Sequence, residues 1–339
     1  MKLLPRYSHV FALLAWSLTG HAQVDMEAVL QAKAAFVERM VTAHGFDRDE
    51  ISGIVDSAEI DEQILDTISA PAERVLAWHE YRSIFVNDAR IRAGVGFWTR
   101  HAEAIAEASE AYGVAPEVLV AILGVETSYG RIMGSHRVID ALVTLAFAYP
   151  PRAAFFASEL EAFFLLVREE GIDPQSVLGS YAGAMGAGQF ISSSYRAYAV
   201  DGNGDGQRDL WGEWRDVLAS VANYFSAHGW RRDEPVVDRA RLTRRRSGDE
   251  PPNSPDLDAT VASLRDGGYA FSTQLPGETP ATLLSLEGED GQEYWVGYHN
   301  FYVITRYNRS VMYALAVHQL GQSLLAAYAP ARSVSEAGQ

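Results

Sequence analysis

The stretch VLVAILGVETSYGR, residues 118–131, is an apolar run that ends on one carboxylate, Glu126. We expect a helix over 116–127, because its first residue is a proline and the positions that follow are apolar. Leu119, Ile122 and Glu126 would then share one helix face. Apolar surroundings disfavour the charged form of a carboxyl group and raise its pKa towards the range of a general acid. The alternative is a helix-end Glu that reaches solvent, and the pattern alone leaves both open.

Helical periodicity continues on both sides of this stretch. It predicts further helices over 26–44, 59–69, 72–86, 88–112, 137–148, 152–170, 193–199, 213–228 and 309–328. Three segments look like short strands instead: ATLLSLEG (281–288), EYWVGY (293–298) and FYVIT (301–305). The sequence therefore predicts a mainly α protein of the α+β class, with a small β-containing insertion in a helical body.

The N-terminus has the pattern of a secretory signal peptide, residues 1–22. Lys2 and Arg6 precede the apolar stretch VFALLAWSL (10–18), and a small residue, Ala22, stands at the expected cleavage point. An uncleaved anchor is the alternative, although the apolar stretch is short for a bilayer. The chain contains no cysteine, which excludes disulfides and attachment of lipid through a cysteine. We therefore expect an exported protein in the periplasm.

The charge of the chain disfavours nucleic acid as a partner. The net charge is −16, and loss of Lys2 and Arg6 with the signal peptide would make it −18, since residues 1–22 contain no acid. A negative charge of this size repels nucleic acid and anionic lipid surfaces.

Four long strings carry a resemblance to a known family. They are GVETSYGRIMGSHRVIDALVTLAFAYPPRAAFFASELEAF (124–163), GSYAGAMGAGQFISSSYRAYAVDGNGDGQRDLW (179–211), SVANYFSAHGW (220–230) and NFYVITRYNRSVMYALAVHQLGQ (300–322). In this order and at this spacing they resemble the lytic murein transglycosylase B family, over most of residues 30–325. The family cleaves the MurNAc-β-1,4-GlcNAc bond of peptidoglycan without water and leaves a 1,6-anhydromuramoyl end.

The resemblance implies a fold and a division into domains. We expect a lysozyme-like helical core with an added N-terminal helical domain. The implied order is a signal peptide (1–22), an N-terminal helical domain (23–95), the catalytic core (96–230), a β-containing insertion (231–290), a return to the core (291–330) and a tail (331–339). Peptidoglycan glycan strands are the implied partner, and proteins of cell-wall synthesis are left open as further partners.

The resemblance also implies the site residues. Glu126 matches the family's single catalytic acid and base. The residues that match substrate-binding positions are Arg152, Ser180, Met185, Gln189, Phe190, Tyr224, Asn300 and Tyr302. The chain departs from the family at Pro151, where an adjacent arginine is expected, and at Val296, where some members carry a tyrosine.

A single acid suits an intramolecular reaction better than a hydrolysis. Glycoside hydrolases generally use two carboxylates, and the matched segments offer no second acid at a position of a nucleophile. Glu126 would protonate the leaving oxygen and then accept the proton of the C6 hydroxyl as that oxygen closes onto C1. A hydrolytic muramidase, a non-catalytic peptidoglycan-binding protein and a calcium-dependent interaction protein remain as alternatives.

The stretch DGNGDGQRD, residues 201–209, resembles the start of an EF-hand calcium loop. Asp201, Asn203 and Asp205 occupy positions one, three and five, and the backbone carbonyl of Gln207 occupies position seven. Position twelve is a glycine, and the resemblance implies Asp216 as the last ligand, with Glu213 as a competitor. We expect structural calcium in the loop 201–216, with sodium as an alternative, and no organic cofactor.

Overall fold

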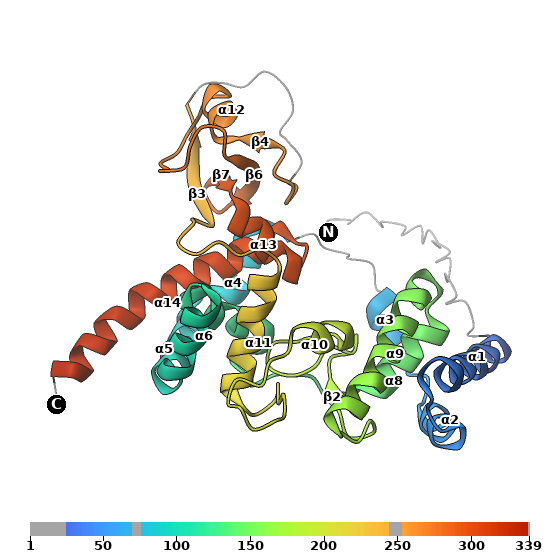
Figure 1. The fold of residues 1–339 in the computed structure, drawn as a ribbon. Coiled ribbons are helices and arrows are strands. Elements are labelled where there is room, and N and C mark those ends of the chain that lie inside the picture. The colour runs from blue at the N-terminus through green and yellow to red at the C-terminus, as the bar shows by residue number, and fades with distance from the viewer. Residues whose placement is uncertain (1–24, 70–75, 244–252, 338–339) are drawn as a thin grey trace, which may run out of the picture.

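The computed structural model describes residues 25–69, 76–243 and 253–337 (Figure 1). The expected signal peptide lies outside the described residues. The helices are α1 (Met26–His44), α2 (Arg48–Ser57), α3 (Glu62–Ser69), α4 (Trp78–Phe85), α5 (Asp88–Arg100), α6 (Ala102–Tyr112), α7 (Pro116–Thr127), α8 (Val138–Ala148), η1 (Pro150–Arg152), α9 (Ala153–Glu170), α10 (Ser192–Tyr198), α11 (Trp214–Ala227), α12 (Val261–Asp266), α13 (His299–Tyr307) and α14 (Val311–Ala337). The predicted mainly helical class is confirmed.

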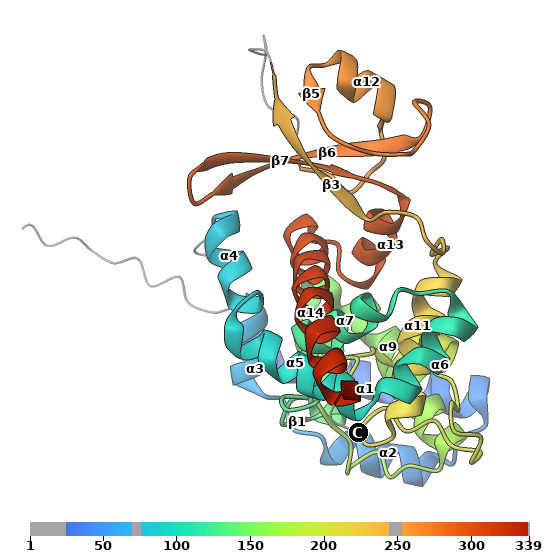
Figure 2. The same cartoon turned by 90° about the vertical axis from the view of Figure 1, so that its left-hand side faces the viewer.

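The centre of the helical body is α7, which packs along α14 (Figure 2). Every residue of α7 from Val118 to Val125 is buried, so the continuous apolar run VLVAILGV is covered on all sides. Helices α4 and α5 lie against α14 as well, while α6 packs on α11. This arrangement brings the last turn of α7 towards the N-terminal half of α14, although the two segments are far apart in the sequence.

A second group of helices lies beside this centre. Helices α8 and α9 pack on each other and are joined by the short turn at Pro150–Arg152, and α1 and α3 pack on α8 (Figure 1). A buried lysine, Lys33, ties α1 to α2 by donating hydrogen bonds to the carbonyl oxygens of Val55 (2.9 Å) and Ala58 (3.2 Å). The short strands β1 (His136–Arg137) and β2 (Leu178–Gly179) pair next to α8.

A five-stranded antiparallel sheet stands at one end of the helical body (Figure 1). Its order is β4 (Ala259–Thr260), β6 (Pro280–Gly288), β7 (Gly291–Gly297), β3 (Val237–Leu242) and β5 (Tyr269–Ala270). Both faces are covered in the middle of β6: Leu283 packs with α12, whereas Leu284 and Leu286 join the main core. Alternate residues of a strand face opposite sides, so two covered faces explain why apolar residues occupy the successive positions 283 and 284.

Several predicted elements differ from the observed ones. FYVIT was predicted as a strand and is part of the helix α13, and the helix predicted over 88–112 is broken at His101. Helix α2 was not predicted, the sheet runs beyond residue 290 through β7, and α14 continues to Ala337 into the predicted tail. Among the described residues, no single helix is long and apolar enough to cross a membrane, although two sharply bent pairs, α6 with α7 and α8 with α9, reach that length together.

Candidate active site

Glu126 lies in the last turn of α7, where the helix stops abruptly. Ser128 (φ 54°) and Tyr129 (φ 64°) both adopt left-handed backbone conformations, which end the helix immediately after the carboxylate. The chain turns back so that the Tyr129 ring packs over Gly124, where an added Cβ would lie 2.7 Å from the Tyr129 hydroxyl. The motif GVETSYG therefore needs glycine at 124, and two strained residues fix the point at which Glu126 leaves the helix.

The carboxyl group of Glu126 is surrounded by protein, while the residue keeps a partly exposed surface. Burial raises its pKa to about 7, and a hydrogen bond from the Tyr313 hydroxyl opposes part of that rise. Neither cause involves a second carboxylate. A group with this pKa is protonated in a large fraction of molecules at neutral pH and can also exist as the anion, which are the two states that an acid and base requires.

Three tyrosines from different elements surround this carboxyl group. Tyr313 is on α14 and is 3% exposed, Tyr307 ends α13, and Tyr81 is on α4. Burial and the negative charge of Glu126 raise the pKa of all three. They are therefore neutral hydrogen-bond donors at neutral pH. We call Glu126 with these three tyrosines the Glu126 cluster.

The glycine-rich loop 179–190 lies next to the Glu126 cluster. The Tyr307 hydroxyl donates to the carbonyl oxygen of Gly188 (2.5 Å), and a Cβ at 188 would lie 3.1 Å from that hydroxyl. Gln189 has a left-handed backbone (φ 52°), and its side-chain amide donates to the carbonyl oxygens of Gly186 (3.0 Å) and Met133 (3.2 Å). Both amide hydrogens are thus used, which leaves the Gln189 Oε1 as an acceptor.

Ser180, Met185 and Phe190 shape the same loop from within. The Ser180 hydroxyl accepts hydrogen bonds from the backbone N–H groups of Ala182 (3.3 Å) and Ala184 (3.0 Å). Met185 has no exposed surface, and Phe190 is 3% exposed and packs near the rings of Tyr224 and Tyr307. These predicted substrate-binding residues therefore gather beside Glu126, with Met185 and Phe190 supporting the loop from below its surface.

Thr127 ties the loop to the helix that carries the acid. It is 1% exposed; its hydroxyl donates to the carbonyl oxygen of Ala187 (2.8 Å) and accepts from the N–H of Gly130 (2.9 Å). The N–H of Ala187 in turn donates to the carbonyl oxygen of Leu210 (2.8 Å), which lies within the predicted cation loop 201–216. One buried hydroxyl thus fixes the distance between Glu126 and Gln189.

We expect Thr127→Val to destabilise the protein by about 1–3 kcal/mol, because it leaves a buried carbonyl and a buried N–H without partners while it preserves the side-chain shape. Denaturant unfolding would measure the difference. Thr127→Ser keeps the hydroxyl and should recover most of the loss. Equal stability of Thr127→Val and the wild type would show that the hydroxyl does not hold the loop.

Four of the predicted site residues are placed differently. Arg152, in η1, is exposed and lies over the rings of Phe155 (4.3 Å) and Phe156 (5.1 Å). Tyr224 is 8% exposed, and its hydroxyl donates to the carbonyl oxygen of Arg306 (2.6 Å). Its ring is packed among aromatic neighbours, so it supports Tyr307 from behind (4.8 Å between ring centroids).

Asn300 and Tyr302 are on α13, the helix that ends with Tyr307 of the Glu126 cluster. Asn300 is fully buried and exchanges hydrogen bonds with the backbone of Arg231 (2.9 and 2.8 Å) and Glu234 (2.9 Å). Its predicted contact with substrate is not available in this structure, because every polar atom of its amide binds backbone. Tyr302 is half-buried, with the Arg306 guanidinium over its ring at 6.0 Å.

Tyr313, Tyr307 and Tyr81 were not predicted from the sequence as site residues. Tyr313 lies 187 residues from Glu126 and sits in a strongly apolar helix, where a tyrosine is typical of core packing. Tyr307 stands within the string NFYVITRYN, five residues after the tyrosine that was chosen. The string itself held a usable signal, because it contains a second tyrosine, Tyr307. Tyr307 stands at the end of the segment, where a side chain can face a neighbouring loop.

The predicted cation loop is a tight turn built on side-chain oxygens. Asp201 accepts backbone hydrogen bonds from Gly204 (2.6 Å), Asp205 (3.1 Å) and Gly206 (2.8 Å). Asn203 accepts from the N–H of Asp205 (2.9 Å), and Asp205 accepts from that of Gln207 (2.8 Å). These bonds bring three oxygen-bearing side chains into one turn.

Asp216 takes a different place from the predicted one. It is fully buried at the start of α11, and its carboxylate accepts from the N–H groups of Gly202 (2.8 Å), Asn203 (3.2 Å) and Asp209 (2.8 Å). Burial raises its pKa, with a smaller contribution from the charge of Asp201. Asp216 is therefore an anchor for the loop backbone, and in the part of the chain that the structure describes no three acidic or histidine side chains converge on a metal position.

The donor chemistry of the loop nevertheless fits a hard cation. In residues 25–69, 76–243 and 253–337, the ion pairs involve neither Asp201 nor Asp205, while the nearby Arg208 pairs with Glu169 and Glu170. Asp201 and Asp205 each keep oxygen lone pairs beyond those used by the backbone. A bound cation would offset the repulsion between carboxylates in one turn.

Comparison with known proteins agrees with this geometry. A family model described as a transglycosylase SLT domain matches residues 28–322. The membrane-bound lytic murein transglycosylase B of Escherichia coli strain K12 is 42% identical over 300 residues, which are 85% of this chain and 81% of that protein. The resemblance proposed from the quoted strings is confirmed.

Three solved structures superpose closely. Soluble lytic transglycosylase SltB1 from Pseudomonas aeruginosa has a TM-score of 0.83 at 48% identity and covers 88% of this chain and 99% of its own. The Escherichia coli lytic transglycosylase Slt35, solved in complex with calcium, has a TM-score of 0.81 at 41% identity and covers 88% of this chain and 94% of its own. SltB3 from P. aeruginosa, solved with NAG-anhNAM-pentapeptide, has a TM-score of 0.76 at 30% identity and covers 88% and 80%.

These matches also confirm the predicted lysozyme-like core with small sheets. The family model and the curated relative each cover well over half of the chain, and the relative is 42% identical to it. The chain therefore belongs to the SLT-domain family of lytic murein transglycosylases, enzymes that act on peptidoglycan.

Proposed function

We propose that the protein cleaves the MurNAc-β-1,4-GlcNAc bond of peptidoglycan and forms 1,6-anhydromuramoyl products, with Glu126 as the single acid and base. The observation that carries this proposal is the buried carboxyl group of Glu126, whose pKa burial raises to about 7. Its hydrogen-bond partner is the Tyr313 hydroxyl rather than a second acid. The solved complex of SltB3 with NAG-anhNAM-pentapeptide supports the substrate class.

The reaction needs one carboxyl group in two protonation states. Protonated Glu126 donates its proton to the O4 oxygen of the leaving GlcNAc as the C1–O4 bond breaks. The positive charge that develops at C1 is then quenched by the C6 oxygen of the same MurNAc, which forms the C1–O6 bond. The C6 hydroxyl proton passes to the Glu126 anion, so the acid is regenerated and no water is consumed.

The tyrosines of the Glu126 cluster supply the environment for both steps. Their burial keeps water away from the carboxyl group, which favours the protonated acid before bond cleavage. The Tyr313 hydroxyl then stabilises the anion that forms after proton donation. We propose Gln189 and Ser180 as polar contacts to the substrate, with Met185 and Phe190 beneath them. Arg152, at the edge of η1, is the one predicted cation available to a peptide stem.

Mass analysis of the products released from purified sacculi tests this proposal. A 1,6-anhydro end is one water lighter than the reducing end that a hydrolase leaves. Reducing-end muramic acid as the main product would make the protein a muramidase. Binding to sacculi without release of any product would make it a peptidoglycan-binding protein.

We propose that the loop 201–216 binds calcium through the side chains of Asp201, Asn203 and Asp205 and the carbonyl oxygen of Gln207, with Asp216 anchoring the loop. The calcium complex of Slt35 supports this choice. The ion would hold the turn that leads to Leu210, whose carbonyl receives the Ala187 N–H. Its role would be structural.

Calcium should raise the melting temperature of a chelator-treated sample. Binding to the folded state alone stabilises by RT ln(1 + [Ca]/Kd), and with a Kd of about 1 mM a concentration of about 10 mM contributes about 1.4 kcal/mol. Differential scanning fluorimetry measures the shift. Asp205→Asn should reduce it, whereas Asp173→Asn should not, since Asp173 accepts the same type of backbone bond, from Gln175 (2.9 Å), outside the loop. An unchanged melting temperature in the wild type would overturn the site.

We propose export to the periplasm with a cleaved signal peptide and no lipid anchor. The support is the order of Lys2, Arg6, the apolar stretch and Ala22, together with the absence of cysteine. The curated relative is named membrane-bound, so the two proteins would differ in attachment. N-terminal sequencing of the exported protein decides the matter, because an intact Met1 in a membrane fraction contradicts cleavage.

A further inference from the structure

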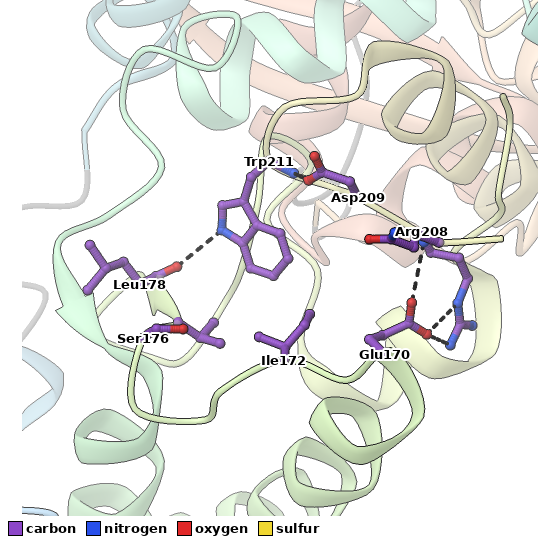
Figure 3. A pocket seen from close by; sticks show the side chains of 9 residues that line it. Glu170, Ile172, Ser176, Leu178, Arg208, Asp209 and Trp211 are labelled. Atoms are coloured by element: carbon purple, nitrogen blue, oxygen red, sulfur yellow. Dashed lines mark hydrogen bonds and ion pairs between the residues drawn. The ribbon is translucent and has the colours of Figure 1, made fainter. Parts of the chain in front are cut away.

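A cavity of about 440 Å³ is lined in part by residues 207–211 of the predicted cation loop (Figure 3). It is open to solvent and is lined by residues from the C-terminal end of α9, the segment 172–178 and the run 207–211. Neither Glu126 nor any tyrosine of its cluster lines this cavity. Its volume falls within the range of ordinary small-molecule sites, which are about 300–1,000 Å³. The cavity is thus a separate feature that the proposed reaction does not use.

One wall of the cavity is apolar and contains a flat ring. The indole of Trp211 stands over Ile172, with Leu178 to one side (Figure 3). Leu178 is 49% exposed, so its apolar side chain is open to solvent beside the ring. The Trp211 Nε1–H is 3.4 Å from the carbonyl oxygen of Leu178, a long and therefore weak hydrogen bond. The ring is positioned by packing and keeps a polar edge at the cavity.

The charges around the cavity are already used within the protein. Arg208 forms a hydrogen-bonded ion pair with Glu170 (Figure 3). One carboxylate oxygen of Asp209 accepts the N–H groups of Trp211 (2.7 Å) and Gly212 (3.1 Å). An anionic ligand would need a cation without a partner, and the lining offers Arg208 only in its pair with Glu170. The lining therefore disfavours an anionic ligand, whereas a neutral ligand needs no charge from it.

The remaining polar groups are hydroxyl and amide groups at the rim. Gln207 is exposed, and the Ser176 hydroxyl, which donates to the carbonyl of Asp173 (2.8 Å), keeps its lone pairs free to accept. A ligand that fits has one apolar face for the indole and a polar edge for these groups. A pyranose ring with an N-acetyl group has this distribution, since its axial C–H bonds form an apolar face and its hydroxyl and amide groups lie around the edge.

The cavity also adjoins the proposed substrate loop. Leu178 belongs to β2, and Ser180 follows two residues later, so their Cα atoms are at most about 7 Å apart. A glycan that occupies the loop near Ser180 therefore has neighbouring sugar units within reach of the cavity.

We propose that this cavity is an accessory saccharide site, in which an N-acetylated hexosamine unit stacks on Trp211. The proposal rests on the proposed function for the identity of the polymer. Its physical basis is the combination of an available indole wall, an arginine that is already paired with Glu170, and continuity with the loop at Ser180. Stacking on an aromatic wall is the main source of affinity in such a site, and hydroxyl and amide contacts give orientation.

The test is a titration of the purified protein with tri-N-acetylchitotriose, followed by the indole N–H resonance of Trp211 in a ¹H–¹⁵N NMR spectrum. Trp211→Phe identifies that resonance by its loss. We expect the signal to move saturably in the wild type. Leu178→Arg places a long side chain into the cavity from an exposed position and should weaken the response at least about tenfold in Kd, the cost of one dominant contact.

A matched control uses an exposed leucine elsewhere. Leu325, on α14, is 42% exposed, and Leu325→Arg should titrate like the wild type. A Trp211 signal that stays unchanged up to the solubility limit of the trisaccharide overturns the site. So does an equal response of Leu178→Arg and the wild type, because the signal would then report binding elsewhere.

The same sample distinguishes this proposal from the proposed function. The wild-type protein is also assayed for anhydro products from sacculi. Anhydro products with a silent Trp211 signal overturn the accessory site and leave the proposed function intact. A saturable Trp211 signal without anhydro products overturns the proposed function and supports the cavity as a saccharide site.

Discussion

Replacing Glu126 by glutamine should lower the release of muropeptides from purified sacculi by at least about 10²–10⁴-fold, the contribution of one general acid or base step. Glutamine preserves the size of the side chain and can still accept the hydrogen bond of Tyr313, so the fold and the binding surface should persist. It has no proton to give to the leaving oxygen and does not accept the C6 hydroxyl proton. Both steps are therefore affected by one substitution.

A matched control lies on the same helix. Glu117, in the first turn of α7, is also partly buried, and burial raises its pKa as well. Glu117→Gln removes a similar charge from α7 without touching the Glu126 cluster, and its product release should stay within a few-fold of the wild type. Near-normal release by a folded Glu126→Gln protein would return Glu126 to a structural role and overturn the proposed mechanism.

The same variant has a consequence for stability that follows from the pKa. The pKa of Glu126 in the folded protein is about 7, above its ordinary value of 4.5. The folded state therefore binds the proton more tightly, and folding stability falls as pH rises from about 4.5 through 7. Glutamine does not ionise, so Glu126→Gln should be the more stable protein at pH 8, by up to about 3 kcal/mol.

Melting temperatures across pH check this sign. The difference between Glu126→Gln and the wild type should be small near pH 4.5 and should grow up to about pH 8. Parallel curves for the two proteins would mean that the carboxyl group is as well solvated in the folded state as in the unfolded one. A buried acid that costs stability at working pH is typical of a functional group rather than a structural one.

The sequence predicted the helix of the acid well because its signals are local. The apolar run, the initial proline and the step of three and four define α7 within a single window, and its observed bounds equal the predicted ones. FYVIT was predicted wrongly because five apolar residues fit a buried strand and a helix equally well. In the structure the segment is part of α13, and Val303 and Ile304 are fully buried there, which a buried strand would have allowed equally well.

The surroundings of Glu126 were less accessible to sequence reasoning. Periodicity showed that Glu126 shares a face with apolar residues, but it contained no information on which element covers that face. Tyr313 covers it from α14, and a tyrosine in the run VMYALAV is indistinguishable from a core residue. Asn300 shows the opposite error: its motif suggested substrate binding, and the fold uses its amide to satisfy buried backbone at 231 and 234.

The second large effect is expected for Tyr313→Phe. This change removes the hydroxyl that donates to the Glu126 carboxylate and leaves the buried ring in place. A hydrogen bond to a charged group contributes about 1.5–3 kcal/mol, so its loss destabilises the ionised form of Glu126 relative to the protonated form. The pKa of Glu126 should therefore rise further. Tyr313 acts on the reaction only through Glu126, so it is a positioning residue. Its removal must therefore change the pH at which Glu126 loses its proton.

The pH profile of product release separates this role from a structural one. Activity needs protonated Glu126 at the start, so the alkaline limb of the wild type should lie near pH 7. In Tyr313→Phe that limb should move upward by about one to two pH units, and the maximal rate should fall by about 10–100-fold because the anion formed in the reaction has lost its donor.

Tyr298→Phe is the matched control: it removes an equally buried hydroxyl that donates to a carboxylate, Asp238 (2.7 Å), in the sheet, and it should leave the limb in place. A lower rate in Tyr313→Phe with an unmoved limb would show that the tyrosine only packs against Glu126, because a donor to the anion cannot be removed without changing the pH at which the anion forms.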